Sequence, residues 1–228
     1  MTGPEKGEFR AVVPHQRDMD PRTTALIVVD LTRFDAHPEH GFAGVLAEEG
    51  TDLSYYWDRV EALAVPNSAR LLEGFRVAGG RVVFTRVGGQ FEDYGDSLVH
   101  LRDLHRRSGT LRGTEEFDLR DEFVPRLGEA VVDKPGSSAF TTGNLDVLLR
   151  NAGVRTLVCC GVVTNACVLL TALAGWDLGY DVRIVDDACA SDSQEMHDAA
   201  LSVAHWLGCV VTDTDRVLQE LLAASAVS

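Results

Sequence analysis

The sequence predicts an α/β protein whose parallel sheet is covered by helices on both faces. Short apolar runs alternate with longer segments of helical periodicity along most of the 228 residues, which is typical of repeated strand–helix units. The run 25–30 is continuously apolar up to its last residue, as in a strand buried on both faces. Since crossovers between parallel strands are right-handed, we expect a Rossmann-like, three-layer α/β/α arrangement with six parallel strands.

The first predicted strand, "ALIVVD", shows the pattern clearly, because a continuous apolar run ends in a single aspartate. The later runs are similarly short, which favours strands over helices. The six predicted strands are 25–30, 81–87, 129–134, 155–162, 181–188 and 209–214.

Between these strands, apolar residues recur at helical spacing. Pro66 interrupts the longest helical segment, 53–80, and Gly79 and Gly80 end it, since glycine commonly follows the last turn of a helix. The other predicted helices are 96–107, 144–153, 166–179, 193–208 and 215–225.

Length and charge limit the classes of function. A chain with 45% hydrophobic residues is long enough for one substantial core, so we expect a single domain at 23–228 after an N-terminal extension, 1–22. The formal charge of −14 makes nucleic acid and anionic membrane surfaces poor partners. No stretch is long and apolar enough to span a membrane, and the N-terminus lacks an apolar signal segment, so we expect a cytoplasmic protein.

Charged residues end two of the apolar strands. In parallel sheets ligands bind beyond the carboxyl ends of the strands, so Asp30 and Lys134 are candidate site residues. A buried carboxylate and a buried ammonium each need a partner, and a purely structural ion pair explains both equally well. If the strand order is 3-2-1-4-5-6, the two strands lie roughly 9–10 Å apart, and Lys134 then has to reach over the end of the second strand to meet Asp30.

Cys167 differs from the other cysteines in its predicted location. It follows the fourth strand near the start of a helix, where the dipole, with a nearby lysine, favours a thiolate and where an aspartate can accept the thiol proton. That combination suits covalent catalysis. We interpret the other cysteines as packing residues without metal-binding spacing, and adjacent strand positions face opposite ways. They are Cys159, Cys160, Cys189 and Cys209.

A metal site is a weaker alternative. His37 and His40 lie three positions apart in the segment "DAHPEHG", where an ordinary solvated loop is the simpler interpretation. We therefore expect no metal and no cofactor.

Three blocks of sequence resemble one known family, the isochorismatase-like cysteine hydrolases. They are "ALIVVDLTRFD", "VVDKPGSSAF" and "GVVTNACVLLTALAGWDLGYDVRIVDDACAS", and the resemblance extends over about residues 23–220. It implies the isochorismatase-like hydrolase fold and a catalytic triad of Asp30, Lys134 and Cys167. It also implies a cis peptide between Val162 and Val163, with the backbone amides of Val163 and Cys167 forming an oxyanion hole.

Departures from the family pattern narrow the implied chemistry. Many members continue the first block as Asp-x-Gln-Asn, where this chain has Thr32 and Arg33 after Leu31. The segment after the second strand, "TRVGGQFEDYGD", lacks the histidines that hold a metal in nicotinamidases. Cys167 argues against the vinyl-ether chemistry of isochorismatases. The pattern is most similar to metal-free amidohydrolases of ureidoacrylate, biuret and N-carbamoylsarcosine.

The resemblance thus implies a hydrolase that cleaves a C–N bond of a small carboxamide or ureido compound through a cysteine thioester. Candidate substrate-binding residues are Phe34, Arg33 and Phe140, for which core packing or a surface salt bridge is the alternative. A homo-oligomer, dimer or tetramer, is expected, with residues 35–52 and 88–118 as a lid or a subunit contact. The competing functions are a catalytically silent interaction module and an isochorismatase- or nicotinamidase-type hydrolase.

Overall fold

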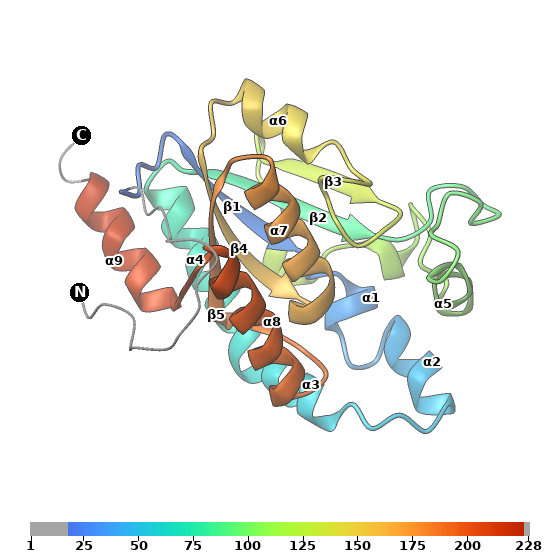
Figure 1. Cartoon of the computed structure of the whole chain (residues 1–228). Helices are drawn as coiled ribbons and strands as arrows, with labels where there is room; N and C mark the ends of the chain where they lie inside the picture. Colours follow the sequence, from blue (N-terminus) through green and yellow to red (C-terminus); the bar gives the residue numbers. More distant parts are fainter. Residues whose placement is uncertain (1–17, 226–228) are drawn as a thin grey trace.

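A six-stranded, entirely parallel sheet forms the centre of the molecule in the computed structural model, which describes residues 18–225 (Figure 1). The strand order is β3-β2-β1-β4-β5-β6, in which β2 separates β3 from β1. The strands are β1 (Thr24–Val29), β2 (Arg81–Val87), β3 (Ala130–Lys134), β4 (Thr156–Val162), β5 (Asp181–Ala190) and β6 (Val210–Thr212).

Helices cover both faces of the sheet and complete the predicted three layers. One face is covered by a helical run, α3 (Ser54–Arg59) to α4 (Val65–Val77), together with the C-terminal helix α9 (Thr214–Ser225). The other face is covered by α6 (Leu145–Asn151), α7 (Leu169–Asp177) and α8 (Gln194–Leu207). Burial of apolar side chains between sheet and helices is the main stabilising contribution in such a fold.

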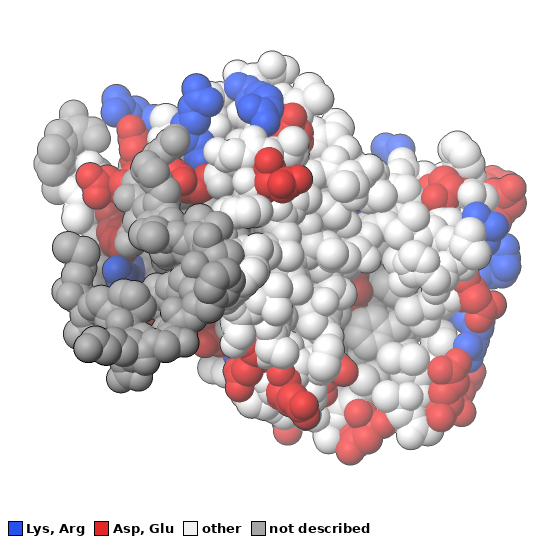
Figure 2. All heavy atoms as spheres, viewed as in Figure 1, with Lys and Arg blue, Asp and Glu red and all other residues white. Residues whose placement is uncertain are grey.

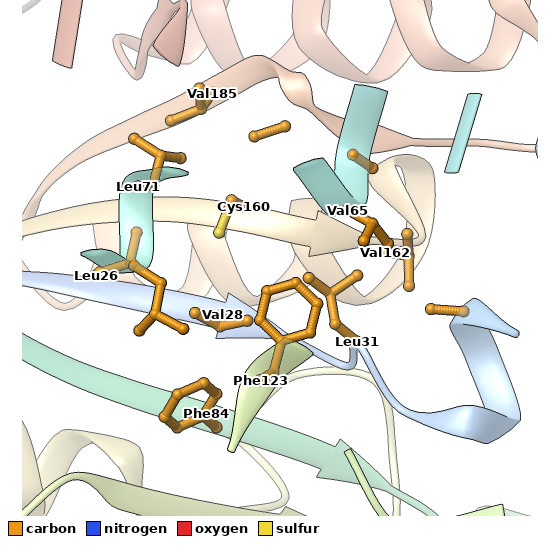
Figure 3. Packing of buried hydrophobic residues seen from close by; sticks show 14 of the residues in the cluster. Leu26, Val28, Leu31, Val65, Leu71, Phe84, Phe123, Cys160, Val162 and Val185 are labelled. Carbon is orange, nitrogen blue, oxygen red and sulfur yellow. The ribbon is translucent and has the colours of Figure 1, made fainter. Parts of the chain in front are cut away.

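The two adjacent cysteines of β4 illustrate the layers. Cys160 belongs to the core cluster on the α4 side, where it lies among Leu71, Val65 and Val162 (Figure 3). Cys159 belongs to the cluster on the α7 side. The prediction that they face opposite ways is therefore confirmed, and both are fully buried packing residues.

The long helical segment predicted around Pro66 is divided differently from the prediction. A π-helical turn, η1 (Val60–Ala64), joins α3 to α4, and Pro66 lies in the first turn of α4. Proline is tolerated there because the first backbone N–H groups of a helix have no intrahelical acceptor. The segment therefore continues through Pro66 instead of breaking at it.

Several short elements beyond the carboxyl ends of the strands were not predicted. Their sequences are too short to show a helical period. They are α1 (Arg33–Ala36), α2 (Phe42–Glu48), η2 (Glu115–Phe117) and η3 (Asp121–Phe123). The predicted helix 96–107 is shorter in the structure, where it forms α5 (Arg102–Ser108). Figure 1 shows α1, α2 and α5 at the end of the sheet to which the strand arrows point.

Gly161 allows an unusually close approach between β4 and β1. Its φ is +114°, and a Cβ atom built there would lie 2.0 Å from the backbone oxygen of Val29. The register between β4 and β5 also shifts between Cys159 and Gly161. Only glycine fits this position, which comes immediately before the turn that carries Cys167.

The charge of the chain is unevenly distributed over its surface. Figure 2 shows acidic side chains along the lower and right-hand edges of one face, while the middle of that face, over α7, is largely uncharged. Within residues 18–225, no helix is long and apolar enough to cross a membrane. The predicted N-terminal extension, 1–22, lies almost entirely outside the described residues. The first strand begins at Thr24.

Candidate active site

Asp30 follows β1 directly and is completely buried. Its φ of +50° places a non-glycine residue in the left-handed region, which turns the chain sharply at the end of the strand. Thr85, on the neighbouring strand β2, donates a hydrogen bond of 2.6 Å from its hydroxyl to Asp30 Oδ1. The same hydroxyl accepts the Asp30 backbone amide at 3.2 Å, so one threonine holds both the backbone and the carboxylate.

Lys134 ends β3, and its ammonium reaches the same place over the end of β2. Its Nζ lies 2.7 Å from Asp30 Oδ2, 3.0 Å from the backbone oxygen of Gly136 and 3.5 Å from Cys167 Sγ. Lys134 is also completely buried. Burial acts to lower its pKa, but the acidic neighbours, Asp30 foremost, together raise the pKa of Lys134 above its usual value. The lysine is therefore a fixed positive charge.

Cys167 lies on a π-helical turn, η4 (Thr164–Val168), which precedes α7. The sequence predicted an ordinary helix start here, whereas the Val168 amide donates to the Val163 oxygen five positions earlier. Burial raises the pKa of the Cys167 thiol well above its usual value, although Lys134 acts in the opposite direction. Burial thus favours the thiol form of Cys167, whereas the helix start and the lysine favour the thiolate.

The peptide bond between Val162 and Val163 is cis. Val163 follows β4 and lines the same cavity as Cys167. The turn after this bond is held by the buried side chain of His197 on α8, which also contacts Asp186 on β5. Thr164 Oγ1 lies 2.9 Å from His197 Nδ1, and His197 Nε2 lies 2.8 Å from Asp186 Oδ1.

A cavity of about 250 Å³ opens onto Cys167. Its outer wall comes from the two segments that the sequence analysis named as a lid or a subunit contact. Phe42 and Leu46 belong to residues 35–52, and Leu104 and His105 belong to residues 88–118. Both segments therefore enclose the space above the cysteine.

The structure separates the three candidate substrate-binding residues. Phe34 lines the cavity, with its ring edge-on to His105 at 5.5 Å between centroids. Arg33 does not line it, because its guanidinium donates to Asp121 Oδ1 at 2.8 Å. Phe140 does not line it either, because its ring packs against Tyr180 in the core beside α7. The structure therefore shows Arg33 in a salt bridge and Phe140 in core packing, which are the alternatives given for these residues in place of substrate binding.

Sequence reasoning missed two polar residues of the site. Thr85 lies in the middle of an apolar strand, where a lone threonine gives no functional signal. Asp35 lies on α1, is only 6% exposed and lines the cavity. Its one sequence signal is its position five residues after Asp30, where a single turn of chain brings it back toward the strand end.

The two loop histidines do not form a metal site with other residues. His40 Nδ1 lies 3.0 Å from Glu116 Oε1, and the Glu39 amide donates to His37 Nδ1 at 3.2 Å. In the part of the chain that the structure describes, no group of three or more potential metal ligands is present.

Comparison of the chain with proteins of known structure gives close matches in fold. A cysteine hydrolase from Pseudomonas syringae pv. phaseolicola superposes with a TM-score of 0.77 at 24% identity, covering 94% of this chain and 99% of that one. N-carbamoylsarcosine amidase from Thermoplasma acidophilum superposes with a TM-score of 0.65 at 25% identity, covering 85% and 97%.

Sequence relatives give a more specific result. The chain is 33% identical over 218 residues to ureidoacrylate amidohydrolase RutB of Serratia proteamaculans, covering 89% of this chain and 84% of the relative. RutB of Acinetobacter baylyi is 32% identical over 210 residues, covering 86% and 82%. Residues 59–216 match the isochorismatase domain. Fold, relatives and matched domain agree with the resemblance seen in the three sequence blocks, and the chain belongs to the isochorismatase family.

Proposed function

We propose that the protein, acting through one domain at 23–228, hydrolyses a C–N bond of a small carboxamide or ureido compound through a thioester on Cys167. The observation that carries the proposal is the position of Lys134 Nζ, in contact with both Asp30 Oδ2 and Cys167 Sγ beside the cavity. A carboxylate, an ammonium and a thiol in one place provide a base, a fixed charge and a nucleophile. The amidohydrolase relatives support the predicted enzyme class, a hydrolase of C–N bonds outside peptides.

In the first half-reaction, Asp30 takes the Cys167 proton as the sulfur attacks the substrate carbonyl carbon. The backbone amides of Val163 and Cys167 hold the oxygen of the tetrahedral intermediate as an oxyanion hole. The C–N bond then breaks, and protonated Asp30 passes its proton to the nitrogen, which leaves as ammonia or an amine. Cys167 need not be ionised at rest in this sequence, which suits a thiol whose pKa is raised by burial.

In the second half-reaction, a water molecule attacks the thioester carbon while Asp30 accepts its proton. The C–S bond breaks, the acid product leaves, and the proton returns to the sulfur of Cys167. Lys134 keeps its positive charge throughout and stabilises whichever partner is anionic at each step. No step requires a metal or a cofactor.

The test is a screen for ammonia release with purified protein. The substrates are ureido acids, biuret, N-carbamoyl amino acids and simple carboxamides. Intact-mass spectrometry after rapid acid quenching is expected to show an acyl adduct on the peptide that contains Cys167. Turnover without any dependence on Cys167 would overturn the thioester mechanism, and no turnover in the whole screen would overturn the amidohydrolase assignment.

Alkylation by iodoacetamide distinguishes the enzyme from a catalytically silent relative. Cys167 is 8% exposed and lines the cavity, whereas Cys159 and Cys209 are 0% exposed. Cys167 is therefore expected to be alkylated first in the native protein, and a bound substrate is expected to protect it. Equal rates for all three cysteines would favour a silent interaction module.

We also propose that the protein is a homo-oligomer, a dimer or a tetramer. Apolar side chains on the adjacent helices α7 and α8 support this, since Leu170 is 47% exposed and Val203 is 48% exposed. Light scattering during size-exclusion chromatography is expected to give a multiple of the 24.8 kDa chain mass. A mass of one chain at all concentrations would contradict it.

A further inference from the structure

The chemistry of the cavity walls limits which amides can enter. The cavity of about 250 Å³ is smaller than the roughly 300–1,000 Å³ typical of sites for drug-sized ligands. Aromatic and aliphatic side chains form most of its wall, among them Phe34, Phe42, Leu53 and Tyr56. The space therefore suits a small molecule with an apolar body.

No arginine or lysine is among the described residues that line this cavity. Burial lowers the pKa of His105 to about 4, with Lys134 acting in the same direction, so the imidazole is uncharged near pH 7. The Lys134 ammonium already forms an ion pair with the Asp30 carboxylate, at 2.7 Å. A carboxylate on the substrate would find no free cation here.

The charged groups that do line the cavity are acidic. Asp192 is exposed, and Asp35 is buried within the wall. Asp35 Oδ2 accepts a long hydrogen bond of 3.4 Å from the Thr32 hydroxyl. Its other carboxyl oxygen, Oδ1, accepts no hydrogen bond from residues 18–225 and is not fully buried. Burial, followed by the nearby Asp30 carboxylate, raises the pKa of Asp35 well above its usual range.

A carboxyl oxygen that lines a cavity, is partly accessible and has no partner within the protein can pair with a molecule bound there. In its protonated form, Asp35 offers one O–H donor and one acceptor to a molecule in the cavity. This pair complements an amide or urea group, which itself has an acceptor and a donor side by side. An anionic group would find no free cation among the lining residues and would lie near the carboxyl group of Asp192.

We propose that Asp35 is a substrate-binding residue and that the cavity selects uncharged amides or ureas with an apolar body, against substrates that carry a carboxylate. The inference rests on the proposed function and specifies its substrate class. It separates this chain from the relatives named for ureidoacrylate, because acrylate is a carboxylate.

Two isosteric pairs of substrates test the selection. Succinamate is compared with 4-methylpentanamide, and N-carbamoyl-β-alanine with 3-methylbutylurea; in each pair an isopropyl group replaces the carboxylate. The uncharged member is expected to have a kcat/KM at least about tenfold higher. Equal values, or a preference for the carboxylate, would overturn the inference while leaving the amidohydrolase assignment intact.

Binding to the Cys167→Ala variant, measured by titration calorimetry, keeps the test informative if turnover fails. Tighter binding of the uncharged members supports the inference even where the proposed chemistry is wrong. Tighter binding of the carboxylates, or no binding of either member of either pair, contradicts it.

Substitution of Asp35 tests its direct role. Asp35→Leu is expected to raise KM for the uncharged substrates at least about tenfold, with a smaller effect on kcat. Asp35→Asn restores an uncharged donor and acceptor and is expected to recover most of that loss. If Asp35→Leu changes only the melting temperature, or if Asp35→Asn recovers nothing, Asp35 does not bind the substrate.

Discussion

Lys134 Nζ lies 2.7 Å from Asp30 Oδ2 although the strands that end in these residues, β3 and β1, are separated by β2. The middle strand contributes Thr85, whose hydroxyl donates to the other oxygen of the same carboxylate. The Asp30 carboxylate is thus bound by one side chain from β2 and one from β3. The contact depends on the length of the lysine side chain.

The buried ion pair is expected to make substitution of its lysine costly. Lys134→Met leaves the Asp30 carboxylate uncompensated in the interior, which is expected to lower the free energy of unfolding by about 3–5 kcal/mol. The double variant Asp30→Asn/Lys134→Met removes both charges and is expected to recover most of that loss, as measured by urea denaturation. If the loss in the double variant equals the sum of the losses in Lys134→Met and Asp30→Asn, the two residues are not energetically coupled.

Cys167→Ala is expected to abolish ammonia release, with a decrease in kcat of at least about 10³-fold, because the residue supplies the nucleophile. Its melting temperature is expected to change little, since only one sulfur atom at the edge of a cavity is removed. Cys209→Ala is the matched control, because Cys209 is buried in the core away from the cavity. Substantial turnover by Cys167→Ala, measured by ammonia release, would contradict covalent catalysis.

Thr85→Val removes the hydroxyl that bridges the amide and carboxylate of Asp30 while keeping the shape of the side chain. We expect a loss of about 1–3 kcal/mol in the free energy of unfolding, because buried polar atoms of Asp30 lose their partner. A lower kcat is also expected, since the base is less well oriented. Thr85→Ser retains the hydroxyl and is expected to keep both properties; a loss in Thr85→Ser equal to that in Thr85→Val would point to packing instead.

Gly161→Ala is expected to destabilise the protein by at least about 3 kcal/mol, because the new Cβ collides with the Val29 oxygen at a positive φ. Gly179 provides the control, since its φ is +91° and nothing lies within 4 Å of an added Cβ. Gly179→Ala is expected to cost only about 1 kcal/mol, the conformational part alone. Similar losses in the two variants, compared by chemical denaturation, would mean that the contact with Val29 relaxes.

His105 is expected to make the fold less stable in acid. Its folded pKa of about 4 lies below the usual 6.5, so between these values the unfolded chain binds a proton that the folded chain does not. The free energy of unfolding therefore falls as pH decreases from about 6.5 toward 4, by at most about 1.4 kcal/mol per pH unit. Asp35, whose folded pKa is raised, contributes with the opposite sign above its usual value of 3.8.

Comparison with His105→Asn isolates the histidine from Asp35 and the other carboxyls. The variant keeps an uncharged polar group near Ser97, which lies 3.0 Å from His105 Nδ1. Its stability is expected to depend less on pH between 4 and 6.5 than that of the unmodified protein. Parallel profiles in a pH series of denaturation curves would contradict the prediction.

Much of the fold was accessible from local patterns. A continuous apolar run such as 25–30 forms a central parallel strand, because side chains on both faces of such a strand are covered by helices. The short helices α1 and α2 were not predicted because four to seven residues show no period, and their packing against the cavity rather than their own sequence stabilises them. The π-helical turn at Cys167 was missed for a similar reason, since its composition is that of an ordinary helix.

The sequence by itself determined the class of fold, with an aspartate and a lysine at strand ends and a cysteine near the start of a helix. These follow from the order of apolar and polar residues along the chain, whereas the family followed from three blocks of resemblance. The strand order came from the structure. Only the tertiary structure decided that Lys134 spans a strand to meet Asp30, that Phe140 packs in the core, and that Asp35 lies in the cavity wall. Those results depend on strand twist and on distances between segments far apart in the chain, which no local pattern records.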